Sequence, residues 1–149
     1  MGVFYHVQPF DDEMASLLEE MGAAVPAADG PSRYPTPHEV REVCAALRGF
    51  KTEFYVKPKS HWSADIQSTT DDRGTLLHIE KFKGKEDQPL PVFFEKGSPS
   101  LILEILKRLA KPCGPLVVIP DTGDTPIAVT ARASIPKLLK AWGSPEDDV

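Results

Sequence analysis

Two histidines and two carboxylates alternate along neighbouring segments of the sequence, which makes them the first candidates for chemistry. They are His61, Asp65, His78 and Glu80. On β-strands, alternate residues share one face. If the two strands aligned suitably, the four side chains would form one surface able to bind a metal or perform acid–base chemistry. Solvent-facing strand pairs show the same pattern of polar side chains, and we favour this second interpretation.

Other motifs with possible chemistry are incomplete. Asp121-Thr122-Gly123-Asp124 resembles half of an aspartic-protease dyad, but both carboxylates fall in one turn, where Asp and Gly are common. Cys44 and Cys113 have neither a CxxC neighbour nor a histidine at ligand spacing. The sequence contains no GxxxxGK[ST], GxGxxG or GxSxG motif. We therefore expect no catalytic residue, no cofactor and no metal.

The charge of the chain is acidic and unevenly distributed. The net charge over 149 residues is −5, and residues 1–30 contain no Lys or Arg. This balance argues against nucleic acid as a partner, because the phosphate backbone attracts basic surfaces. The predicted first helix would carry five acidic side chains. We predict a surface for a protein partner there, formed by Asp11, Asp12, Glu13, Glu19 and Glu20. The alternative is an acidic helix face that only contacts water.

A second, smaller charged pattern has the opposite sign. Lys81, Lys83 and Lys85 alternate and would share one face if their segment were a strand. We interpret them as a solvated basic stripe.

The sequence predicts a cytoplasmic protein that does not enter a membrane. The N-terminal residues lack the basic and apolar regions of a secretory signal. No apolar run approaches the roughly 18 residues that a membrane-spanning helix requires.

Apolar spacing and turn residues indicate alternating strands and helices. Thr36, Pro37 and Glu39 predict a capped helix start, and Ser98-Pro99 predicts another. Trp62, Ala64 and Ile66 alternate with polar residues, which is typical of a strand buried on one face. The predicted strands are 3–8, 54–57, 61–69, 75–83, 91–96, 116–119 and 126–130. The predicted helices are 11–21, 37–48, 99–111 and 134–142, where Pro112 is expected to end the third.

This order of elements predicts the fold class. We expect a single α+β domain over residues 1–149, with an acidic, frayed tail at 144–149. Its antiparallel or mixed sheet would have about five to seven strands, with three to four helices packed mainly on one face.

One segment adds a resemblance. SPSLILEILKRLAKPCGPLVVIPDTGDTPIAV, from Ser98 to Val129, is similar in pattern to small bacterial immunity proteins encoded beside toxins that contact-dependent or type VI secretion delivers. The resemblance implies an acidic, non-enzymatic α+β protein dedicated to blocking one toxin. It transfers no functional residue, because such proteins recognise their partners through variable surfaces.

Three hypotheses of function follow. The first is a non-catalytic, cytoplasmic protein-binding domain, an immunity-type inhibitor of a cognate toxin, either monomeric or homodimeric. The second is a small-ligand-binding protein or metal-assisted enzyme that uses the face of His61, Asp65, His78 and Glu80. The third is a secretion chaperone or adaptor, which would be a dimer with an exposed apolar groove.

Overall fold

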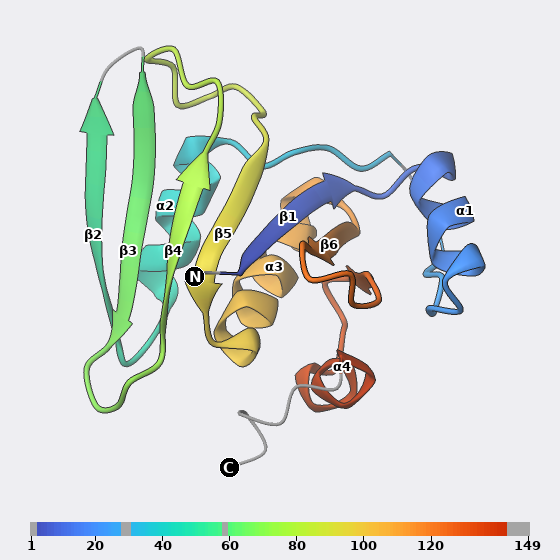
Figure 1. Cartoon of the computed structure of the whole chain (residues 1–149). Helices are drawn as coiled ribbons and strands as arrows, with labels where there is room; N and C mark the ends of the chain where they lie inside the picture. The colour runs from blue at the N-terminus through green and yellow to red at the C-terminus, as the bar shows by residue number, and fades with distance from the viewer. Residues whose placement is uncertain (1–2, 28–30, 58–59, 143–149) are drawn as a thin grey trace.

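A seven-stranded antiparallel sheet forms the centre of the protein, as the computed structural model shows for residues 3–27, 31–57 and 60–142. The strand order is β2-β3-β4-β5-β1-β6-β7, and every neighbouring pair is antiparallel (Figure 1). The strands are β1 (Phe4–Pro9), β2 (Phe50–Lys57), β3 (His61–Ser68), β4 (Gly74–Ile79), β5 (Val92–Gly97), β6 (Leu116–Pro120) and β7 (Ile127–Val129). The helices are α1 (Asp12–Glu20), α2 (Pro37–Ala46), α3 (Pro99–Cys113) and α4 (Ile135–Trp142). The predicted α+β class is confirmed, and the predicted tail at 144–149 lies outside the described residues.

Helix α3 covers the inner face of the sheet and supplies much of the core. Nine of its fifteen residues are buried, and it contacts β4, β5, β6 and β7. The same core contains Trp62, Ala64 and Ile66 of β3 and Phe94 of β5, all fully buried. The predicted inward face of β3 is thus confirmed. Helices α2 and α4 pack into the same core, and α4 does so through the half-buried Leu138, Leu139 and Trp142.

Helix α1 lies on the opposite face of the sheet, at the β6–β7 end (Figure 1). Its Leu18 is fully buried against Phe10 and Val117 in a second, small core. Because α1 is only nine residues long, it covers β6 and β7 and leaves the outer face of the other five strands without a helix. Met21, at the C-cap of this helix, is 42% exposed.

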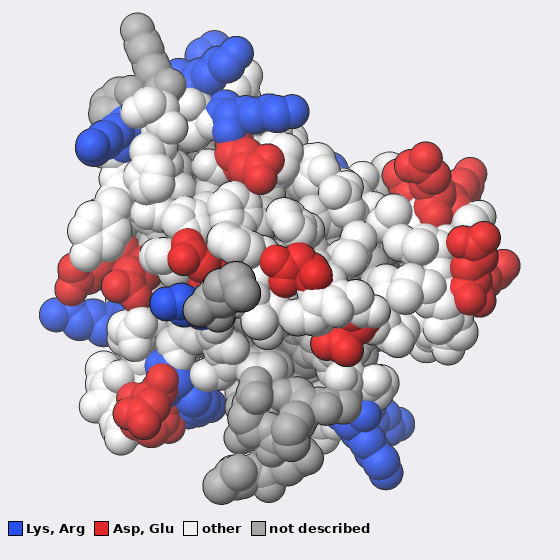
Figure 2. All heavy atoms as spheres, in the orientation of Figure 1, with Lys and Arg blue, Asp and Glu red and all other residues white. Residues whose placement is uncertain are grey.

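The chain after β4 departs from the prediction. We predicted a strand to residue 83, but β4 ends at Ile79 and Lys81 adopts a left-handed conformation with φ of 63°. This conformation redirects the chain, so that Phe82 enters the main core instead of the outer face. The predicted stripe of Lys81, Lys83 and Lys85 does not lie on a strand, and the three side chains are exposed in the loop that follows. Figure 2 shows basic side chains gathered at the end of the molecule where this loop lies in Figure 1.

Several element boundaries also differ from their prediction. Helix α3 continues through Pro112 to Cys113, because a proline in the last turn removes one hydrogen bond without preventing the turn. Ser98 takes the N-cap position, but its hydroxyl makes no capping hydrogen bond. At α2 the predicted capping box of Thr36 and Glu39 is confirmed. Helix α2 ends at Ala46, two residues before the predicted end, and β2 begins at Phe50 rather than at residue 54.

A partly buried ion pair between Arg33 and Glu39 helps to join the loop before α2 to the end of α3. Both terminal nitrogens of Arg33 donate to the Glu39 carboxylate, at 2.8 and 2.7 Å, and the backbone N–H of Arg33 donates to the Cys113 carbonyl at 2.9 Å. Glu39 also accepts from the N–H of Thr36 at 2.9 Å. The hydrogen bonds from Arg33 are the main reason why the pKa of Glu39 is lowered to about 2.

A second bidentate pair ties α2 to the β4–β5 loop. Arg41 donates to both oxygens of Glu86, at 2.6 and 2.7 Å, and its guanidinium lies over the rings of Phe54 and Trp62. The indole N–H of Trp62 donates to the same carboxylate at 3.2 Å. The indole N–H of Trp62, the largest core side chain, therefore finds its hydrogen-bond partner in a loop that the Arg41–Glu86 pair holds in place.

Shortening a core side chain of α3 should destabilise the fold. Leu106 is fully buried, so Leu106→Ala should lower the free energy of unfolding by about 2–5 kcal/mol through lost burial and a residual cavity. Urea unfolding followed by circular dichroism measures the change. Lys111→Ala, at an exposed position of the same helix, is the control and should stay within about 0.5 kcal/mol of wild type. Equal effects of the two substitutions would contradict the assigned packing.

Glu39 should make stability depend on pH in the acid range. Its pKa lies below the ordinary 4.5, so its contribution is complete above that pH and is lost as the pH falls toward about 2. Glu39→Gln should cost about 2 kcal/mol at pH 7. The difference between wild type and variant should shrink between pH 4.5 and 2. A difference that stays constant across that range would refute the role of the charge.

Candidate functional site

The outer face of β2, β3, β4, β5 and β1, here called the open face, is the largest surface of the sheet without a helix over it (Figures 1 and 2). Figure 2 shows this face as mainly uncharged, with separate acidic and basic side chains. From the registers, its outward residues are Lys51, Glu53, Tyr55, Lys57, His61, Ser63, Asp65, Gln67, Leu76, His78, Phe93, Glu95, Phe4, His6 and Gln8.

Four rings form a continuous row across the open face, which we call the aromatic row: His61, His78, Phe93 and His6. The ring centroids of His61 and His78 lie 6.2 Å apart, and His78 stacks on Phe93 at 4.7 Å with a 20° interplanar angle. His6 lies 6.0 Å beyond Phe93. The row crosses four strands, and Phe4 flanks it 5.8 Å from Phe93. Side-chain contacts across neighbouring strands therefore hold these rings in a defined arrangement.

Hydrogen bonds orient the two central histidines. Nε2 of His61 lies 2.9 Å from the hydroxyl oxygen of Ser63, and Nε2 of His78 lies 2.9 Å from a carboxylate oxygen of Glu95. Asp65 instead accepts from the side-chain amide of Gln67 at 2.9 Å. The structure thus brings His61 and His78 together on one face, and places Asp65 two strand positions away from their contact.

Glu80 does not join this cluster. It follows the end of β4 and is exposed, and Glu95 of β5 takes the place beside His78 that the sequence had suggested for an acid on the same strand. Glu80 affects Tyr34 instead. Burial, and after it the negative charges of Glu80 and Asp11, raise the pKa of Tyr34. The Tyr34 hydroxyl donates a hydrogen bond to Gln8 at the β1 end of the open face. The pattern of residues 75–80 could not reveal Glu95, because its position depends on the β4–β5 register.

The contact between Ser63 and His61 has the form of a nucleophile beside a base. Ser63 is only 3% exposed, however, and the described part of the chain places no carboxylate in hydrogen-bond contact with His61. Nor does any group of three or more His, Cys, Asp or Glu side chains among residues 3–27, 31–57 and 60–142 have a geometry that could hold a metal ion. The Ser63 hydroxyl is thus covered in this arrangement.

The two thiols are not activated. Burial raises the pKa of Cys44 to about 11 and the pKa of Cys113 to about 12. The Cys113 thiol lies 3.9 Å from Glu39, whose negative charge further opposes ionisation. At neutral pH both groups are protonated thiols, which are poor nucleophiles.

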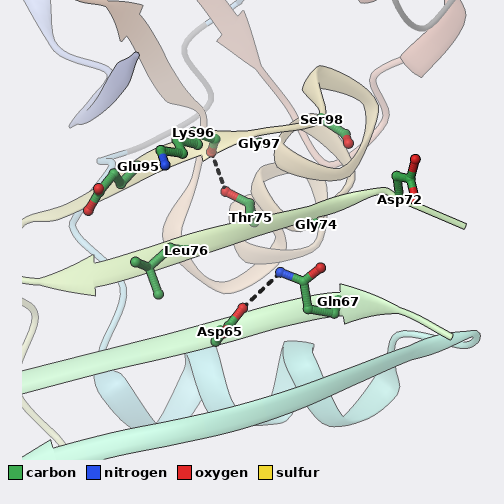
Figure 3. Close-up of a pocket in the computed structure, with 10 residues that line it drawn as sticks. All are labelled: Asp65, Gln67, Asp72, Gly74, Thr75, Leu76, Glu95, Lys96, Gly97 and Ser98. Carbon is green, nitrogen blue, oxygen red and sulfur yellow. Dashed lines mark hydrogen bonds between the residues drawn. The ribbon is translucent and has the colours of Figure 1, made fainter. Parts of the chain in front are cut away.

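An acid-lined hollow of about 410 Å³ opens beside the aromatic row (Figure 3). Its carboxylates are Asp65, Asp72 and Glu95, and Lys96 is its single basic residue. Glu95 belongs to both features, since its carboxylate is in hydrogen-bond contact with His78 and also lines the hollow. The hollow thus continues the row toward the β3–β4 turn and favours a cationic group.

An irregular backbone shapes the floor of this hollow. Lys96 and Gly97 have φ of 56° and 132°, opposite a register shift between Thr75 and Leu76. The buried hydroxyl of Thr75 donates to the Lys96 carbonyl at 2.8 Å. A lysine in the left-handed region costs about 1–2 kcal/mol, and such strain is concentrated at functional sites.

Helix α1 carries the acids that the sequence predicted as a partner surface. Asp11, Asp12, Glu13, Glu19 and Glu20 are all exposed, and they form the acidic end of the molecule in Figure 2. Asp11 is the N-cap and accepts from the N–H of Met14 at 2.9 Å. The first three acids favour the helix start, but Glu19 and Glu20 oppose the dipole at its end. Within the described residues no ion pair compensates them, so their charge remains available to a partner.

Comparisons with known proteins give no assignment. No protein-family model matches this chain, and no curated protein and no solved structure is significantly similar to it. The resemblance to immunity proteins therefore stays a prediction. Within the described residues, every helix is too short or too polar to cross a membrane.

The irregular floor of the hollow yields a prediction. A Cβ on Gly97 would lie 2.5 Å from Thr75 side-chain atoms and 2.8 Å from the Gly74 carbonyl oxygen. Gly97→Ala should therefore lower the free energy of unfolding by about 2–3 kcal/mol, through steric clash and an unfavourable φ. Gly123→Ala is the control, because Gly123 has φ of 87° but open space around it, and should cost only about 1 kcal/mol. Chemical unfolding of both variants checks this, and similar losses would argue against a close-packed floor.

Proposed function

We propose that this protein is a non-catalytic, cytoplasmic binding domain of the immunity type, which neutralises a cognate bacterial toxin by binding it. The observation that carries the proposal is the open face, where the aromatic row crosses four strands without a helix over it. The resemblance over Ser98 to Val129 supplies the class of partner.

The aromatic row suits protein recognition because its rings are already ordered. Phe93 is stacked by His78 and flanked by Phe4, and Glu95 fixes the other side of His78. Side chains held in this way lose little conformational entropy when a partner binds. Buried aromatic anchors also contribute a large share of the energy of protein interfaces. Phe93, half-buried at the centre of the row, is the anchor we assign.

Charge indicates a basic partner. The acid-lined hollow lies at one side of the row, and the acidic α1 lies at the β6–β7 end of the sheet (Figures 1 and 2). Both would attract Lys or Arg side chains of a toxin, and complementary charge speeds association and selects against wrong partners. We assign the hollow to one basic side chain of the partner and α1 to steering its approach.

The other two hypotheses have weaker support. The Ser63–His61 pair faces the partner surface but keeps its hydroxyl covered, which favours a positioning role. A chaperone groove would need clustered apolar side chains. The large exposed apolar residues of the described chain are Met21, Val25 and Tyr55, and they do not come from one continuous element.

Co-expression with the product of the neighbouring gene tests the proposal. We expect a stable complex and protection of the host from toxicity, and Phe93→Ala should raise the Kd by about tenfold or more. Met21→Ala is the matched control, because it removes an exposed apolar side chain outside the open face and should leave the Kd unchanged. Thermal melting verifies that both variants fold.

A separate variant tests the steering role of α1. Glu19→Lys with Glu20→Lys should slow association several-fold at low salt and leave the dissociation rate nearly unchanged. Absence of both complex and protection would exclude the immunity function. A loss of binding as large in Met21→Ala as in Phe93→Ala would place the interface elsewhere.

A further inference from the structure

A second hollow, of about 610 Å³, lies away from the open face, between the helical layer and one end of the sheet. Three arginines line it: Arg48 follows α2, Arg73 belongs to the β3–β4 turn and Arg108 lies on α3. They are half of the six arginines in the sequence. We call this hollow the arginine pocket. Its single acidic lining residue is Glu104, so the lining is net positive within a net acidic chain.

The contacts of these arginines differ from those of the structural ones. Arg33 and Arg41 each hold a carboxylate in a bidentate pair. Arg73 and Arg108 contact Asp71 and Glu104 through Nε, at 3.1 and 2.9 Å. Such a contact orients the guanidinium, and toward the described residues its two terminal nitrogens make no hydrogen bond. Arg48 forms no ion pair within the described residues.

The walls of the arginine pocket are apolar. Leu47, Phe50, Leu101 and Ile135 line it, and the guanidinium of Arg73 lies 5.3 Å above the Phe50 ring. A volume of this order is typical of small-molecule sites. Apolar walls beside three arginines suit a molecule with an anionic head and an apolar or planar body.

We propose that the arginine pocket binds an organic phosphate. The guanidinium fork matches the geometry of phosphate oxygens and donates two parallel hydrogen bonds, which a single lysine ammonium does not provide. Arg48, Arg73 and Arg108 hold the phosphate, and the apolar walls cover the body of the molecule. The pocket shares no lining residue with the acid-lined hollow, so substitutions can probe the two separately.

Calorimetric titration at low salt tests the proposal with adenosine monophosphate, pyrophosphate and adenosine as probes. We expect saturable binding of the two phosphates, and adenosine should bind at least about tenfold more weakly than its monophosphate. Arg48→Gln and Arg108→Gln should each weaken phosphate binding by about tenfold. Arg48→Gln is the cleaner variant, because among the described residues it leaves no carboxylate unpaired.

Arg132→Gln is the matched control, since it removes the same charge at an exposed position outside this pocket. It should bind the probes as wild type does, and thermal melting checks the fold of all three variants. Absence of saturable binding up to roughly 10 mM overturns the site. Equal weakening by Arg132→Gln, or equal binding of adenosine and its monophosphate, does so as well.

Discussion

The packing of α3 against the centre of the sheet is the constraint on which the other features depend. Its buried face contacts four strands and both helices of the same layer, so it joins segments distant in sequence into one core. Helices α2 and α4 complete that layer, and the pairs of Arg33 with Glu39 and of Arg41 with Glu86 hold the adjoining loops. Helices α2, α3 and α4 thus all lie on the inner face of the sheet. Helix α1 lies on the outer face and is too short to cover more than β6 and β7. The open face follows from this unequal distribution.

The sequence predicted what local periodicity and capping determine. The inward face of β3, the capping box of Thr36 and the exposed acids of α1 agree with the structure. It could not predict features that depend on register or on a left-handed residue. Glu95 replaced Glu80 beside His78 for the first reason, and Phe82 entered the core for the second. The arginine pocket was missed because Arg48, Arg73 and Arg108 meet only in the folded chain.

The two hollows have opposite charge and lie on different layers of the molecule. The acid-lined hollow belongs to the sheet surface, where strands position Asp65 and Glu95. The arginine pocket lies where helix ends and strand ends meet, and its guanidinium groups come from three separate elements. The net acidic chain thus contains one acid-lined and one arginine-lined hollow.

The strand order also gives the sheet two unequal ends. β7 has three residues, whereas β2 has eight and leaves a long row of backbone groups at the rim. Such a rim is a template for uncontrolled pairing with other chains. Lys51, Glu53 and Lys57 are exposed along it, and charged side chains on a rim oppose that pairing. The charges that line the β2 edge therefore disfavour edge-to-edge aggregation of the chain.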